Sequence, residues 1–74
     1  MYNFYLEGCS KPVWSYKTWH WARKRLTRLA NDRSLKSARI EYALLFSGVV
    51  VKTGAVVFNQ DGYVWCIDWK RVNL

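Results

Sequence analysis

The chain has 74 residues, of which 51% are hydrophobic and 18% aromatic, and its net charge is +7. This length accommodates one domain, so we expect residues 1–74 to form a single compact domain with a modest free energy of unfolding. The composition excludes a disordered segment, and no apolar run approaches the roughly 20 residues of a membrane-spanning helix.

The N-terminal part of the chain predicts a strand followed by a helix. Residues 2–7 alternate apolar and polar side chains, as a half-buried strand does, and residues 8–12 contain the loop-forming residues Gly, Ser and Pro. A helix is expected from Ser15 or Thr18, either of which is a suitable N-cap, to about Asn31. At about 100° per residue, one arc of this helix forms a core face. It consists of Trp19, Ala22, Leu26, Leu29 and Ala30.

The middle of the chain is ambiguous. Residues 31–34 predict a turn or helix cap. Residues 35–46 fit both a period-2 strand and a helix that ends at Gly48. We favour a strand over residues 39–46, while the helical alternative gives two helices over a three-stranded sheet.

The C-terminal part predicts a hairpin. Residues 49–51 and 55–58 are β-branched runs separated by residues 52–54, which we interpret as a turn or a glycine bulge. Residues 59–62 (Asn-Gln-Asp-Gly) are typical of a hairpin turn, and residues 63–69 are the returning strand. The sequence therefore predicts an α+β fold with one basic amphipathic helix, or two, packed on a small antiparallel sheet of three to four strands.

The positive charge is concentrated in one segment. Residues 11–39 contain nine basic residues and the single acid Asp32, a net charge of +8, whereas the remaining residues sum to −1. A purely structural helix usually places Glu four residues from Lys or Arg, and this one does not. Such a concentration of one sign steers partners of the opposite charge, so we expect an acidic partner.

Catalytic and metal-binding patterns are missing from the sequence. His20 is the only histidine, no phosphate-binding glycine loop or nucleophile elbow is present, and the acids are scattered over expected turns and strand exteriors. We expect no enzyme, no metal, no cofactor and no small-molecule substrate. Cys9 and Cys66 fit no zinc pattern, and in a reducing compartment we expect two buried thiols, with a disulfide between the first and last strands as the alternative. Residues 1–9 do not resemble a signal peptide, which favours a cytoplasmic location.

The outer face of the helix is the candidate binding site. Trp21, Lys24, Arg25 and Arg28 lie opposite the core face, an arrangement suited to phosphates and bases together. The structural alternative is that Trp21 packs under the loop of residues 10–18 with a cation on its ring. His20 is either a contact residue or an ordinary surface histidine. The complete candidate set is Lys17, His20, Trp21, Arg23, Lys24, Arg25 and Arg28.

These features predict a small basic binding protein, and nucleic acid bound with low sequence specificity is the favoured partner. The alternative is an inhibitor or modulator that binds an acidic surface of a host protein, because the size and composition resemble those of small proteins encoded by viruses and mobile elements. A membrane surface is disfavoured, since the apolar arc of the helix contains two alanines and fits a sheet. Trp65, Ile67 and Trp69 could stack on bases, but we expect them in the core.

Overall fold

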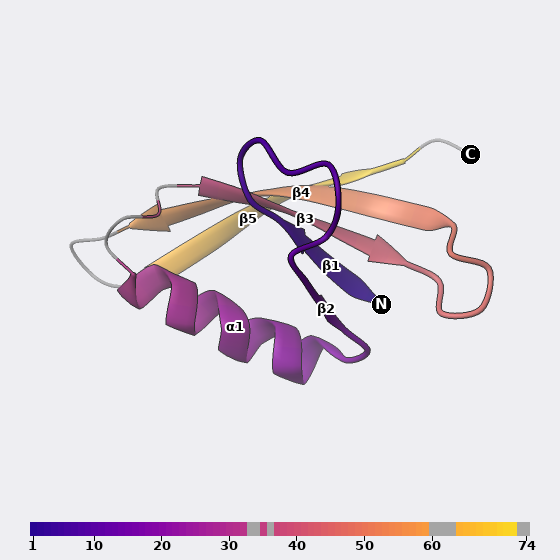
Figure 1. Cartoon of the computed structure of the whole chain (residues 1–74), viewed down its shortest axis with the longest axis horizontal. Helices are drawn as coiled ribbons and strands as arrows, with labels where there is room; N and C mark the ends of the chain where they lie inside the picture. Colours follow the sequence, from indigo (N-terminus) through magenta and orange to yellow (C-terminus); the bar gives the residue numbers. More distant parts are fainter. Residues whose placement is uncertain (33–34, 36, 60–63, 73–74) are drawn as a thin grey trace.

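The described part of the chain folds into one antiparallel sheet and one helix. The computed structural model describes residues 1–32, 35, 37–59 and 64–72. The elements are β1 (Tyr2–Tyr5), β2 (Trp14–Tyr16), α1 (Trp19–Asn31), β3 (Ser37–Ala43), β4 (Val50–Asn59) and β5 (Val64–Arg71). The strand order is β2-β1-β3-β4-β5, and α1 lies on one side of the sheet while the loop between β1 and β2 rises on the other (Figure 1).

The expected sheet of three to four strands is wrong, although the class remains α+β. The strand that the sequence did not predict is β2, which pairs with β1 from Tyr2–Tyr16 to Phe4–Trp14. Ser15, one of the two expected N-caps, lies inside this strand. Three residues show a single repeat of a period of two, which is too little to predict a strand, and β2 is formed by backbone pairing with β1.

The possible second helix is also wrong, because residues 37–43 form the central strand β3. This strand pairs with β1 on one side and β4 on the other, with a register shift between Tyr42 and Ala43. The favoured strand interpretation is therefore confirmed, but its end moves from residue 46 to Ala43. Beyond it a tight connection begins, in which the Gly48 N–H donates to the Leu44 carbonyl at 2.9 Å and Gly48 adopts a φ of 71°. A positive φ is readily adopted only by glycine.

The core lies between α1 and the sheet. The helix buries its expected apolar arc except for Trp19, which is 36% exposed. Trp19 begins the helix after Thr18, which holds the N-cap position without a side-chain hydrogen bond. Its ring packs edge-on against Trp65 and Trp69, with centroids 6.0 and 6.5 Å away. The buried residues of the core cluster are Phe4, Ala22, Leu26, Leu29, Ala30, Ile40, Val56 and Phe58.

β4 is a single strand that passes through Gly54. The expected turn or glycine bulge at residues 52–54 is wrong, because these residues pair with β3 and β5 without interruption. A Cβ atom at Gly54 would lie 2.5 Å from Ile67 Cγ2 and 3.0 Å from both Ile40 Cγ2 and Trp69 Cε3. Glycine is therefore required by side chains that converge on this point from both neighbouring strands.

The final strand places its aromatic residues as expected. Trp65, Ile67 and Trp69 are half-buried and pack against the core, whereas Val64, Cys66 and Asp68 are exposed on the opposite face. The core assignment is confirmed and an exposed stacking platform on β5 is excluded. Residues 60–62 of the predicted hairpin turn at 59–62 lie outside the described residues, as do residues 33–34 of the predicted turn at 31–34 and residue 63 of the predicted strand, whereas Asn59 ends β4.

Candidate nucleic-acid interface

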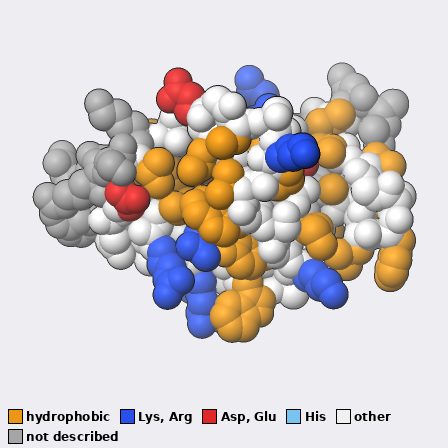
Figure 2. Space-filling view, viewed as in Figure 1, with side chains coloured by type: hydrophobic (Ala, Val, Ile, Leu, Met, Phe, Trp, Pro, Cys, Tyr) orange, Lys and Arg blue, Asp and Glu red, His pale blue; other side chains and the backbone are white. Residues whose placement is uncertain are grey.

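The fold brings four side chains of α1 together on its outer side. Lys24, Arg25 and Arg28 follow Trp21 by three, four and seven residues, so the four side chains project from neighbouring turns of one helix face. With Tyr16 of β2 they line a hollow of about 340 Å³, which we call the α1 hollow. Figure 2 shows Lys and Arg side chains along the lower edge of the molecule, where α1 lies, with hydrophobic side chains exposed between them.

Arg25 forms the fixed wall of the α1 hollow. Its Nε–H donates a hydrogen bond of 2.6 Å to Tyr16 Oη, and its guanidinium carbon lies 4.7 Å from the centroid of the Trp14 ring. Both contacts come from β2, so this short strand holds the guanidinium in one place. A guanidinium has five N–H donors in a rigid plane, and the bond to Tyr16 uses only one of them. The rest of the fork is available to an oxygen-rich ligand.

Trp21 is the exposed aromatic residue of the α1 hollow. The side chain is 55% exposed. Its ring is approached by Lys24 Nζ at 4.8 Å and by the edge of the His20 ring at 5.2 Å between centroids. The expected alternative, in which the loop of residues 10–18 covers this indole, does not fit its exposure. The cation–π contact is present, but at an exposed site it contributes only about 0.5–1 kcal/mol and a ligand can displace it.

The cations of the α1 hollow keep their charge unpaired. Within the described ranges, no carboxylate forms an ion pair with Lys24, Arg25 or Arg28. The first turn of α1 contains no acidic residue, and Arg28 lies in the last turn. The position of Arg28 suits the negative end of the helix dipole, whereas nothing in the first turn offsets the positive end. Positive charge is therefore concentrated on the outer face of α1 from Lys24 to Arg28.

The structure separates the seven candidate residues into three groups. Four of them line the α1 hollow. His20 is exposed beside it and contacts Trp21 edge-on. Arg23 and Lys17 are exposed elsewhere: Arg23 follows Trp21 by two residues and so lies about 200° around the helix, and Lys17 precedes the N-cap. The hollow therefore uses four of the candidates and leaves Arg23 on a different flank of the same helix.

Sequence reasoning missed the contribution of β2. Trp14 and Tyr16 are half-buried and pack against the core on the helix side of the sheet, where both contact Arg25. The signal that could have identified them is the Trp-Ser-Tyr triplet itself, because residues two apart share one face of an extended strand. That signal required the segment to be recognised as a strand rather than as the start of the helix.

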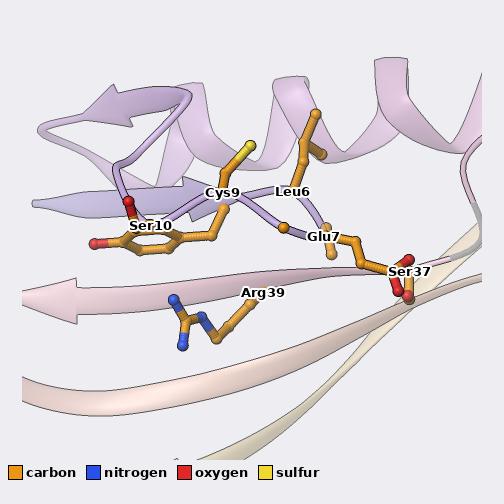
Figure 3. A pocket seen from close by; sticks show the side chains of 9 residues that line it. Leu6, Glu7, Cys9, Ser10, Ser37 and Arg39 are labelled. Carbon is orange, nitrogen blue, oxygen red and sulfur yellow. The ribbon is translucent and has the colours of Figure 1, made fainter.

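A second hollow of about 530 Å³ lies on the side of the sheet away from α1. Cys9 and Ser10 from the β1–β2 loop and Arg39 from β3 surround it (Figure 3). Tyr5 also lines it, and the Arg39 guanidinium carbon lies 4.5 Å from the centroid of the Tyr5 ring. The Tyr5 hydroxyl donates a 2.6 Å hydrogen bond to Glu41 Oε1. Burial, followed by this bond and the charge of Glu41, raises the pKa of Tyr5.

The Tyr5 hydroxyl belongs to a hydrogen-bond network that continues beside this second hollow. Glu41 Oε1 also accepts a 3.1 Å hydrogen bond from Asn3, whose Oδ1 accepts one of 2.7 Å from Ser15. These bonds join β2, β1 and β3 across the face opposite α1, so we assign them a structural role.

Cys9 and Cys66 are free and exposed, which makes both the expected burial and the alternative disulfide wrong.

The described residues contain no group of three or more His, Cys, Asp or Glu side chains that could hold a metal ion. α1 is too short and too polar to span a membrane, and the described part of the chain has no other helix. No protein-family model, curated protein or solved structure matches the chain. The function is therefore inferred from the geometry of the α1 hollow.

Proposed function

We propose that the protein binds nucleic acid through the α1 hollow, with its affinity dominated by charge and with little sequence specificity. The observation that supports this most directly is the exposed indole of Trp21, which shares the hollow with three cations that have no described carboxylate partner. Cations neutralise phosphates and an aromatic ring stacks on bases, so the two kinds of side chain match the two parts of a nucleotide.

The geometry also supports low specificity. The cations of the hollow extend over about one helical turn, from Lys24 to Arg28, and among its lining residues there is no Asn or Gln to read adenine. Contacts of Lys and Arg with phosphates fix a register on the strand but carry no sequence information. The same protein should therefore bind DNA probes of unrelated sequence with similar affinity.

Fluorescence anisotropy with a labelled DNA hairpin that carries a single-stranded tail tests this proposal, because the probe offers both paired and unpaired segments. If Lys24, Arg25 and Arg28 each neutralise one phosphate, log affinity falls by about 2 to 3 units per decade of salt. Between about 50 and 200 mM salt this amounts to a loss of roughly 20- to 40-fold. No binding at low salt, or binding that salt does not weaken, would contradict the proposal.

The helix supplies a matched control for the charge. Arg28→Ala removes a cation of the hollow, whereas Arg23→Ala removes the same charge from another flank of the same helix. Alanine is the best helix former, so neither change should unwind α1. We expect Arg28→Ala to lower the salt slope by about 0.7 to 0.9 and Arg23→Ala to change it much less. Equal effects would mean that net charge, and not the hollow, determines binding.

An acidic protein surface is the alternative partner, since it would use the same cations and the same exposed indole. A pull-down from lysate with and without nuclease separates the two. We expect nuclease to release what the wild-type protein captures. A stoichiometric protein complex that survives nuclease and is lost in Trp21→Ala would overturn the nucleic-acid proposal in favour of this alternative.

A further inference from the structure

We infer that the α1 hollow receives one unpaired nucleotide, so that the partner is single-stranded nucleic acid rather than a duplex. This inference rests on the proposed function and narrows it to a class of ligand. It follows from three properties of the hollow: its size, the exposure of its aromatic wall and the way in which Arg25 is held.

The size of the hollow suits a single small ligand. Its volume of about 340 Å³ lies at the lower end of the roughly 300–1,000 Å³ that small-molecule and cofactor sites occupy. An intact duplex cannot enter such a space, because its bases are stacked inside two strands. One nucleotide that has left a stack can enter, with its phosphate toward the cations and its base toward the rings.

The exposed indole points to the same ligand. Contacts with a duplex backbone need only cations and hydrogen-bond donors, yet Trp21 exposes 55% of its surface beside the cations of the hollow. An aromatic ring gains most from a base whose π-face is uncovered, and paired bases in a duplex have both faces covered by their neighbours. Lys24 Nζ, now 4.8 Å from the ring centroid, lies close enough to turn toward the phosphate of the same nucleotide.

Arg25 supplies a preformed contact for that phosphate. Its side chain is half-buried and is held between Trp14 and Tyr16, so little conformational entropy is lost when a phosphate binds to its free N–H donors. A planar guanidinium binds two oxygens of one phosphate at once. Arg28, one turn farther along, reaches the next phosphate of the strand.

Anisotropy with four matched probes tests the inference: a DNA single strand, the RNA strand of the same sequence, the DNA duplex, and a strand whose sugars carry no bases. A ligand attracted by charge alone binds best as the duplex, which has the highest charge density. We expect the opposite order, with the DNA single strand ahead of both the duplex and the abasic strand by about 5- to 150-fold, the effect of stacking one base. The RNA strand shows whether the 2′-hydroxyl affects binding.

Two variants locate the effect at Trp21. Trp21→Phe keeps an aromatic ring and should retain the preference for the single strand, whereas Trp21→Leu keeps an apolar side chain without a π-face and should lose it. Because Trp21 is exposed, neither change should prevent folding. A duplex or an abasic strand that binds as tightly as the intact single strand would overturn this inference and leave nucleic-acid binding intact. The same preference in Trp21→Leu would also overturn it, and failure of all four probes would overturn the proposed function itself.

Discussion

Replacement of Gly54 by alanine tests how tightly β3, β4 and β5 pack beneath α1. The added methyl group would lie 2.5 Å from Ile67 Cγ2 and 3.0 Å from Ile40 Cγ2 and Trp69 Cε3. None of the three can move freely, because two are branches at Cβ and the third belongs to an indole ring. Overpacking costs about 1–3 kcal/mol, and removing a glycine from a strand returns about 0.5–1 kcal/mol, so we expect a net loss of about 1–2 kcal/mol.

Denaturation in urea, followed by far-ultraviolet circular dichroism, measures this loss. For a domain of this size the change is a large part of the total free energy of unfolding, so the midpoint should shift clearly at a constant m value. The control is Ile67→Leu, which nearly conserves volume but branches at Cγ and therefore removes the closest methyl group. In that background Gly54→Ala should cost about 0.5–1 kcal/mol less. An unchanged or higher stability of Gly54→Ala, or equal costs in both backgrounds, would refute the packing argument.

Three further outcomes are expected. Arg25→Ala and Tyr16→Phe should be coupled by about 0.5–2 kcal/mol in a double-mutant cycle of urea unfolding, because one hydrogen bond joins them, and additive effects would contradict the contact. The raised pKa of Tyr5 favours its neutral form in the folded state, so stability should be full below about pH 10 and fall above it; Tyr5→Phe should reduce that fall in unfolding measured across a pH series. Both Cys9 and Cys66 should react with a thiol reagent in the native protein, and a thiol that reacts only in denaturant would contradict its exposure.

At the candidate site, a local sequence pattern was sufficient to predict which side chains share one helix face. Helical spacing alone placed Trp21, Lys24, Arg25 and Arg28 on one face, because the angle between residues of a helix is set by the backbone and hardly depends on the rest of the protein. The same reasoning included Arg23, since charge was counted along the segment and not around the helix. Helical spacing itself puts Arg23 about 200° from Trp21, so the same periodicity would have placed it on another flank.

Contacts between segments that are distant in the sequence could not be predicted from local spacing. The hydrogen bond from Arg25 to Tyr16 depends on β2, and β2 exists because three residues pair with β1. Gly54 looked like a turn because glycine often ends a strand, whereas its function is to leave space for Ile67 and Trp69 from the neighbouring strand. Both errors arose at positions where the partner is remote in the sequence.

The sequence by itself determined the α+β class, the helix with its core face, the alternation of β5 and the concentration of positive charge, because each depends on residues within a few positions of one another. The tertiary structure decided the number of strands, the continuity of β4 and the exposure of the two thiols. It also decided how Arg25 is held. These properties depend on which strands pair and which faces meet, and such contacts are selected by packing of the whole domain rather than by local preference.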